Sequence, residues 1–196
     1  MHGYSREPIR VYLIDDHDIV RRGLLDLMSA KHDISVVGDS GDDRQAADRI
    51  VRAAPDVLVA DLRLDGGSGV RVCRDVRSKA PAVRFLLLTS AHEDEALAAC
   101  LLCGASGYQT KLVNSSDILE NVRRVGSGRD LISAEDAARA RARLLAQDGY
   151  GELDRVVLAR MLDGWTDERI AEDLDLDPGS ARAAVDRVIA RATSEA

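Results

Sequence analysis

The chain has 196 residues, of which 45% are hydrophobic, and a formal net charge of −7. This length suits one or two small domains with apolar cores. No apolar run approaches a membrane span, and the N-terminus lacks the apolar stretch of a signal peptide, so we expect a cytoplasmic protein. The three cysteines, an odd number, do not suggest a disulfide framework. The acidic balance argues against general nucleic-acid binding by the whole molecule.

Strand-like runs alternate with helical runs five times before residue 130. The expected strands are 10–14, 34–37, 57–60, 85–88 and 106–110. The first expected helix has an apolar stripe of Val20, Leu24, Leu27 and Met28, and the others span 42–54, 69–77, 93–103 and 115–125. Five such repeats predict an α/β fold, a doubly wound five-stranded parallel sheet with right-handed crossovers.

The pattern changes after this point. Residues 126–130 (GSGRD) interrupt it, 133–147 are rich in alanine and arginine and predict an exposed linker helix, and 149–151 (GYG) predict a flexible joint. We therefore expect a first domain over 1–130, a linker over 131–150 and a small all-α domain over 151–196.

Polar side chains stand where the predicted strands end. They are Asp15 and Asp16, Asp61, Thr89 and Lys111. Parallel strands all end at the same edge of a sheet, and ligands bind in the crevice outside that edge. Three carboxylates, a hydroxyl and an ammonium are the groups that bind Mg²⁺ and a phosphoryl group. Any one of them alone would be an ordinary loop residue, so the prediction depends on the ordered set.

The chain resembles the receiver domain of two-component response regulators of the NarL/FixJ subgroup over about residues 9–129. The resemblance is carried by IDDHDIVRRGL, VADLRLDGGSGV and LLLTSAHEDEALAACLLCGASGYQTK. It implies a flavodoxin-like receiver whose Asp61 is phosphorylated by a histidine kinase. The implied Mg²⁺ ligands are Asp15, Asp16, Asp61 and the backbone carbonyl of Arg63. Thr89 and Lys111 would contact the phosphoryl group, and Tyr108 would rotate as a switch.

Some nearby residues have alternative interpretations. Tyr108 is equally well explained as a partly buried tyrosine of the sheet. His17 could be taken for a metal ligand, and Cys100 and Cys103 for a redox or metal pair, but we expect structural roles for all three. Asp65 stands where the family usually has proline, which adds negative charge and flexibility beside the site.

The segment after residue 150 predicts three short helices. Thr166 is placed to cap the second, and Asp177 caps the third, with Pro178 at its first position. The run GWTDERIAEDLDLDPGSARAAV resembles a LuxR-type helix-turn-helix. This resemblance implies base contacts by Ser180 and Arg182 and phosphate contacts by Arg187 and Arg191.

The same segment departs from its family. Residues 151–196 contain six arginines and eleven acidic residues, a net charge of −5, whereas DNA affinity depends on neutralising phosphates. It also stops short of the family's fourth helix, so we expect an atypical, truncated domain. The leading hypothesis is a non-enzymatic transcription regulator with a histidine kinase and DNA as partners and a homodimer left open. The alternative is a signalling adaptor that acts by protein contact.

Overall fold

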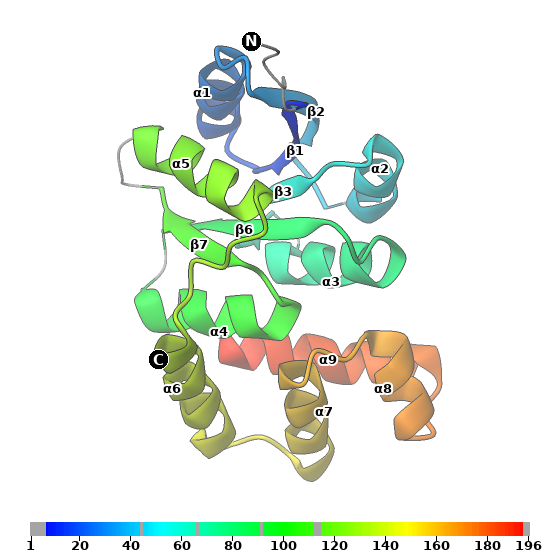
Figure 1. The fold of residues 1–196 in the computed structure, drawn as a ribbon. Coiled ribbons are helices and arrows are strands. Elements are labelled where there is room, and N and C mark those ends of the chain that lie inside the picture. The colour runs from blue at the N-terminus through cyan, green and yellow to red at the C-terminus, as the bar shows by residue number, and fades with distance from the viewer. Residues whose placement is uncertain (1–6, 44, 66, 91, 112–114, 194–196) are drawn as a thin grey trace.

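The N-terminal part is a five-stranded parallel sheet with the order β2-β1-β3-β6-β7 (Figure 1). This is a computed structural model, and it describes residues 7–43, 45–65, 67–90, 92–111 and 115–193. The strands are β1 Ile9–Ile14, β2 Ile34–Ser40, β3 Val57–Asp61, β6 Arg84–Thr89 and β7 Gly107–Thr110. The predicted α/β fold is confirmed, with strand boundaries shifted by up to three residues. None of the described helices is both long and apolar enough to cross a membrane.

The strand order reverses at β1. From β1 the chain goes to β2 on one side, and β3, β6 and β7 then follow on the other. Such a reversal opens a crevice at the carboxyl ends of the two strands that flank it, which here are β1 and β3. Asp15 and Asp16 follow the first of these strands, and Asp61 ends the second.

Helices cover both faces of the sheet. One face packs against α1 (Asp18–Ser29) and α5 (Ser115–Gly126). The other packs against α2 (Ala46–Ala53), α3 (Gly69–Lys79) and α4 (Glu93–Cys103). All five residues of β3 are buried, as expected for a central parallel strand covered on both sides.

Two local features differ from the prediction. Helix α2 is shorter than 42–54, because Gln45 and Ala54 at its ends adopt left-handed backbone angles (φ 52° and 46°). Ala54 also precedes Pro55, which disfavours helical geometry in the residue before it. A small antiparallel hairpin, β4 (Arg63–Leu64) with β5 (Gly67–Ser68), was not predicted, because two-residue strands have no readable periodicity.

The C-terminal part consists of helices. They are α6 Ala134–Ala146, α7 Glu152–Leu162, α8 Asp167–Asp173 and α9 Pro178–Ala192. The predicted caps are confirmed: the side chain of Thr166 accepts from the amide of Arg169, and Asp177 accepts from the first amides of α9. The apolar face of α9 is buried: Ala181, Val185, Val188, Ile189 and Ala192.

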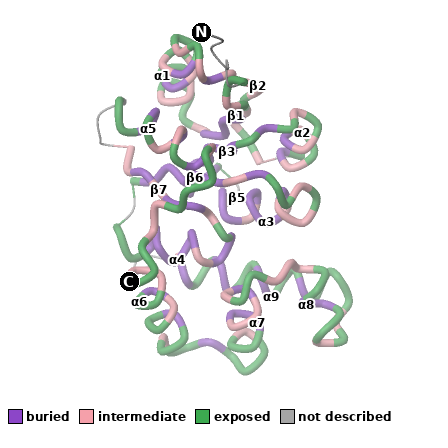
Figure 2. Tube along the Cα trace, viewed as in Figure 1, coloured by how far each residue is buried: buried purple, intermediate pink, exposed green. Residues whose placement is uncertain are grey.

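The helical part docks on α4, which lies between the sheet and helices α6, α7 and α9 (Figure 1). Figure 2 shows that most of α4 is buried. Two predictions are therefore incomplete. The linker helix α6 is not exposed throughout, since Ala140 and Leu144 are buried, and α6 contacts α4. Residues 149–151 are not a free joint, because Tyr150 is only 7% exposed and Arg191 lies over its ring at 5.4 Å.

The first residue of α3, Gly69, packs closely against the backbone at the end of β3. A Cβ atom on Gly69 would lie 2.0 Å from the carbonyl oxygen of Asp61. We expect Gly69→Ala to lower the free energy of unfolding by about 1–3 kcal/mol, because the backbone must move apart. Denaturant titration measures this. Gly23→Ala in α1 is the control. A Cβ atom on Gly23 would have no packing neighbour within 4 Å, so this substitution should raise the free energy of unfolding by about 0.5–1 kcal/mol. Equal stability of Gly69→Ala and wild type would contradict the close packing.

Candidate functional site

Two of the predicted carboxylates are buried in the crevice between β1 and β3. Asp15 is 0% exposed and Asp61 is 4% exposed, while Asp16 is half-buried. Buried carboxylates are found in proteins only when they are paired or bind a cation. The burial of two of them together therefore indicates a cation site rather than an ordinary loop.

Lys111 supplies one positive charge. Its Nζ atom lies 2.6 Å from Oδ2 of Asp61 and 2.8 Å from Oδ2 of Asp15. Its backbone amide donates to the carbonyl of Thr89, which fixes the end of β7 beside the end of β6. One ammonium thus joins the carboxylate that follows β1 to the one that ends β3.

Burial and hydrogen bonding act in opposite directions on the pKa values of Asp61 and Lys111. Burial raises the pKa of Asp61, while the hydrogen bond from Lys111 acts against that rise. For Lys111, burial acts to lower the pKa, but the hydrogen bonds with Asp15 and Asp61 outweigh it and the pKa is raised. A single ammonium still faces three carboxylates, so the crevice stays electronegative and suits a further cation.

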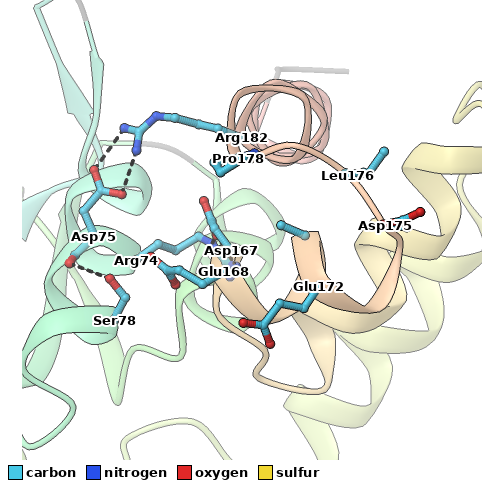
Figure 3. Close-up of a pocket in the computed structure, with 11 residues that line it drawn as sticks. Arg74, Asp75, Ser78, Asp167, Glu168, Glu172, Asp175, Leu176, Pro178 and Arg182 are labelled. Atoms are coloured by element: carbon cyan, nitrogen blue, oxygen red, sulfur yellow. Dashed lines mark hydrogen bonds and ion pairs between the residues drawn. The ribbon is translucent and has the colours of Figure 1, made fainter.

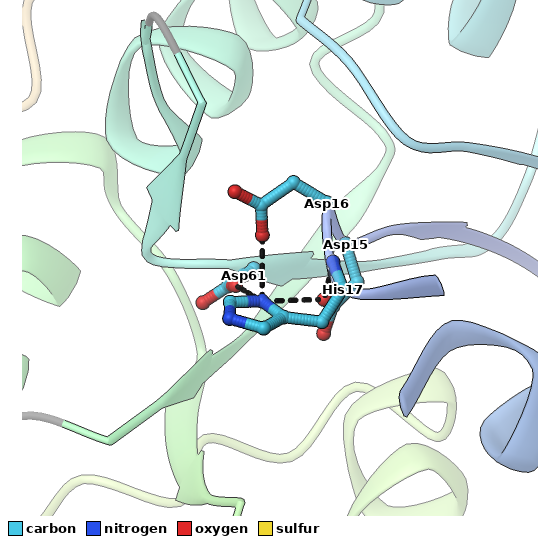
Figure 4. Close-up of side chains that lie close together, drawn as sticks. All are labelled: Asp15, Asp16, His17 and Asp61. Atoms are coloured by element: carbon cyan, nitrogen blue, oxygen red, sulfur yellow. Dashed lines mark hydrogen bonds and ion pairs between the residues drawn. The ribbon is translucent and has the colours of Figure 1, made fainter. Parts of the chain in front are cut away.

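The third carboxylate, Asp16, has one neighbour at each of its two oxygens. Oδ2 of Asp16 accepts a hydrogen bond of 2.8 Å from the amide of Asp65, which a proline at that position could not donate. Oδ1 of Asp16 is buried and has no well-aligned donor among the described residues. Its neighbour is Nδ1 of His17, 2.7 Å away (Figure 4). The donor set Asp15, Asp16 and Asp61 therefore fits a divalent cation that prefers oxygen ligands.

The other predicted receiver residues lie around this centre. Thr89 is buried at the end of β6. The amide of Arg63 donates to Oδ1 of Asp61 at 3.3 Å, and its guanidinium extends to Glu95 of α4 at 2.9 and 3.1 Å. Tyr108 is half-buried and lines a cavity of about 300 Å³ with residues of α4, β7 and α5. Burial alone fits both interpretations of Tyr108.

The four predicted DNA-contacting residues are exposed on α9, and each has a partner within the chain. The hydroxyl of Ser180 donates to Asp177. Arg182 pairs with Asp75 of α3 at 3.0 Å, Arg187 with Asp154 of α7 at 2.8 Å, and Arg191 donates to the carbonyl of Asp148 at 2.8 Å. Of the four, Arg182 lines a cavity of about 420 Å³ together with Leu62 and Arg63, the two residues that follow Asp61.

Sequence reasoning missed the residues that join the two parts of the molecule. Arg74 of α3 is 7% exposed, and its guanidinium donates to Oδ1 of Asp167 at 2.6 and 2.9 Å; Figure 3 labels both residues. The same guanidinium donates to the carbonyl of Trp165 at 2.9 Å. Arg71 reaches Asp167 at 2.6 Å and Asp186 of α9 at 3.1 Å. The only signal in the sequence was the position of Arg74 on the apolar stripe of α3, four residues after Val70.

We call these ion pairs between α3 and the helical part the interface cluster. Its members are Arg71, Arg74, Asp75, Asp167, Arg182 and Asp186. Each pair joins α3 to α8 or α9. The cluster therefore fixes the predicted recognition helix against the domain that contains the buried carboxylates.

Comparisons with known proteins agree with this architecture. Residues 11–123 match the family described as response regulator receiver domain. The chain is 38% identical over 190 residues to "DNA-binding transcriptional activator DevR/DosR" of Mycobacterium tuberculosis, covering 93% of this chain and 88% of the relative. The motifs that resemble the NarL/FixJ subgroup also resemble those of DevR in particular, and this likeness is confirmed.

Solved structures support the same conclusion. A LuxR-family two-component response regulator from Aurantimonas is 29% identical, with a TM-score of 0.62, over 69% of this chain and 99% of that one. RcsB from Salmonella typhimurium, at 18% identity, covers 97% of this chain and 95% of its own with a TM-score of 0.57, which shows a shared fold. The chain belongs to the response regulator family of two-component systems.

Proposed function

We propose that Asp61 accepts a phosphoryl group from a sensor histidine kinase and that this event controls the binding of α9 to DNA in transcription regulation. The observation that carries the proposal is the placement of Asp61, buried at the carboxyl end of β3, within 2.6 Å of Lys111. The 38% identical relative is named as a DNA-binding transcriptional activator, which supports the output. We place the protein in the cytoplasm and propose no separate enzymatic output.

The chemistry needs few groups. An oxygen of Asp61 forms a bond to phosphorus while the bond from phosphorus to the kinase imidazole breaks, and the electron pair of that bond stays on the imidazole nitrogen. Mg²⁺ held by Asp15, Asp16, Asp61 and the carbonyl of Arg63 would neutralise charge on the incoming group. Lys111 then pairs with one phosphoryl oxygen and Thr89 donates a hydrogen bond to another. Tyr108 would follow the movement of Thr89.

A physical route leads from this site to the output helices. Arg63 follows Asp61 by two residues, and its guanidinium makes a two-contact pair with Glu95, which is 8% exposed. Glu95 lies in the first turn of α4, and α4 contacts α6, α7 and α9. A shift of the loop after Asp61 would therefore move the first turn of α4, the helix against which the output helices pack.

The output domain is restrained in this structure. Arg182, the one long basic residue near the start of α9, pairs with Asp75 of the receiver (Figure 3). Loss of the ion pairs of the interface cluster would leave Arg182 available to contact the edge of a DNA base. A phosphoryl group that favours the open arrangement would shift the population toward DNA binding. Two copies on one duplex would gain avidity, which would make phosphorylation-driven dimerisation valuable for so acidic a domain.

The adaptor alternative is favoured by charge. Residues 151–196 have a net charge of −5, and Arg182, Arg187 and Arg191 are all engaged within the chain. An output domain of this kind can serve as a protein-binding surface instead. DNA-binding measurements separate the two functions.

Phosphorylation should depend on one residue. Treatment with acetyl phosphate and Mg²⁺, followed by intact-mass analysis, should add a single phosphoryl group to the wild-type chain. Asp61→Asn should stay unlabelled, because an amide lacks the nucleophilic carboxylate oxygen. Asp56→Asn, on the loop before β3, is the control and should be labelled normally. Equal labelling of Asp61→Asn and the wild type would refute the assignment.

Removal of Asp16 should separate metal binding from folding. We expect Asp16→Ala to lose most of the Mg²⁺-dependent rise in melting temperature, while its metal-free melting temperature stays equal or rises, because clustered carboxylates repel one another. Thermal melts with and without Mg²⁺ measure both effects. Asp18→Ala is the control, since Asp18 is 70% exposed and pairs with Arg21. A full Mg²⁺ response in Asp16→Ala would exclude Asp16 as a ligand.

Loosening the interface should expose α9. Asp75→Asn removes the partner of Arg182, an exposed pair worth at most about 1 kcal/mol, so we expect the unphosphorylated protein to bind DNA about 2- to 5-fold more tightly. Asp48→Asn, which breaks an exposed pair with Lys79, is the control. Mobility shifts on a pool of random duplexes across a salt series measure this.

The same assay distinguishes base contacts from phosphate contacts. Arg182→Ala should flatten sequence preference, since a bidentate arginine–guanine pair is worth about 1–3 kcal/mol. Arg191→Ala should instead weaken binding to all sequences and reduce the salt slope by about 1. If the phosphorylated wild type gives no shift at low salt, the adaptor function is correct.

A further inference from the structure

His17 lies among the three carboxylates of the cation site rather than beside them. Its Nδ1 atom is 2.7 Å from Oδ1 of Asp16, 3.3 Å from Oδ1 of Asp15 and 3.6 Å from Oδ2 of Asp61. Figure 4 shows the imidazole ring directed at all three side chains. The sequence led us to expect a structural role for this residue, and these distances suggest a different one.

The spacing is that of ligand atoms around one ion. An octahedral cation with ligands at about 2.0–2.1 Å places neighbouring ligand atoms about 2.8–3.0 Å apart and opposite ones about 4.0–4.2 Å apart. The three distances from Nδ1 bracket the first value. One ligand atom from each of Asp15, Asp16, His17 and Asp61 can be chosen so that all lie within 4.8 Å of one another.

The ring is held in a position that permits ligation. The backbone amide of His17 donates to Oδ1 of Asp15 at 2.8 Å, which anchors the residue at the start of α1. The side chain is 64% exposed. A neutral imidazole carries a lone pair on one nitrogen and an N–H on the other, so Nδ1 can bind a cation while Nε2–H is hydrated.

We propose that His17 supplies a nitrogen ligand to the cation bound by Asp15, Asp16 and Asp61, and that the site thereby prefers a first-row transition ion such as Mn²⁺ over Mg²⁺. Imidazole suits first-row ions such as Zn²⁺, Fe²⁺ and Ni²⁺, whereas Mg²⁺ prefers an all-oxygen set. Mn²⁺ is the weakest binder of the first-row series and therefore the most stringent member with which to test the preference. Three carboxylates and one imidazole form a mixed set that discriminates between the two ions. The inference rests on the cation site of the proposed function but concerns the identity of the metal.

The test measures metal binding directly on the full-length chain. Mn²⁺ is titrated and followed by electron paramagnetic resonance, Mg²⁺ is titrated in competition, and pulsed measurements on the Mn²⁺ complex detect a directly bound ¹⁴N nucleus. We expect this nitrogen coupling in the wild type and in His32→Gln, a control at an exposed histidine. His17→Gln should lose it, and its preference for Mn²⁺ over Mg²⁺ should fall about tenfold or more.

The other outcomes are equally informative. A wild-type Mn²⁺ complex without nitrogen coupling, or an unchanged preference in His17→Gln, would overturn the inference. A rise in affinity for both ions in His17→Gln would overturn it too, because it would show that the imidazole obstructs the site. These results leave the proposed function intact if Asp61 is still labelled by acetyl phosphate. Labelling of Asp61→Asn would instead refute the proposed function without affecting the nitrogen signal.

Discussion

A single ammonium group joins the ends of three strands. Nζ of Lys111 lies within 2.8 Å of two carboxylates, Asp15 after β1 and Asp61 at the end of β3. Both carboxylates are almost wholly buried, so each would be costly without a partner. The strand order puts β1 beside β3, and the backbone bond from Lys111 to Thr89 holds the end of β7 beside β6. The site is thus a direct product of the sheet topology.

The guanidinium of Arg74 is a second buried charge, and it joins the two domains as Lys111 joins the strand ends. Arg74 is 7% exposed, and its bonds run to Asp167, to the carbonyl of Trp165 and to the carbonyl of Leu102 in α4. A guanidinium buried this far is tolerated only while those acceptors are present. The guanidinium is satisfied when the interface is fully paired, and it would also be satisfied if the interface opened to water. Partial separation is the costly arrangement, and this favours a switch over a gradual loosening.

The sequence predicted what depends on local pattern and strand topology. The five polar residues at strand ends, the apolar stripe of α9 and the caps at Thr166 and Asp177 all follow from periodicity or from rules for helix termini. The burial of Tyr150, the packing of α6 on α4 and the partners of Arg74 were missed. These features depend on how one domain packs against the other, and the hydrophobic periodicity of a single segment carries no information on that packing. The interaction of Asp16 with His17 was missed for a related reason, since adjacent residues rarely face a common point.

The carboxylate site and the buried guanidinium of Arg74 are connected through α4, and charged groups stand at both ends of this path. Apolar packing changes little when a phosphoryl group arrives, but ion pairs respond to a new charge over several ångströms. Arg63 lies two residues after Asp61 and binds Glu95 at the start of α4, while Arg74 binds the end of the same helix at Leu102. In the proposed function, a cation and a phosphoryl group at Asp61 would change the electrostatic environment of Arg63. Because guanidinium groups contact α4 at both ends, a displacement of its first turn would also act on the bonds that Arg74 makes to the output domain.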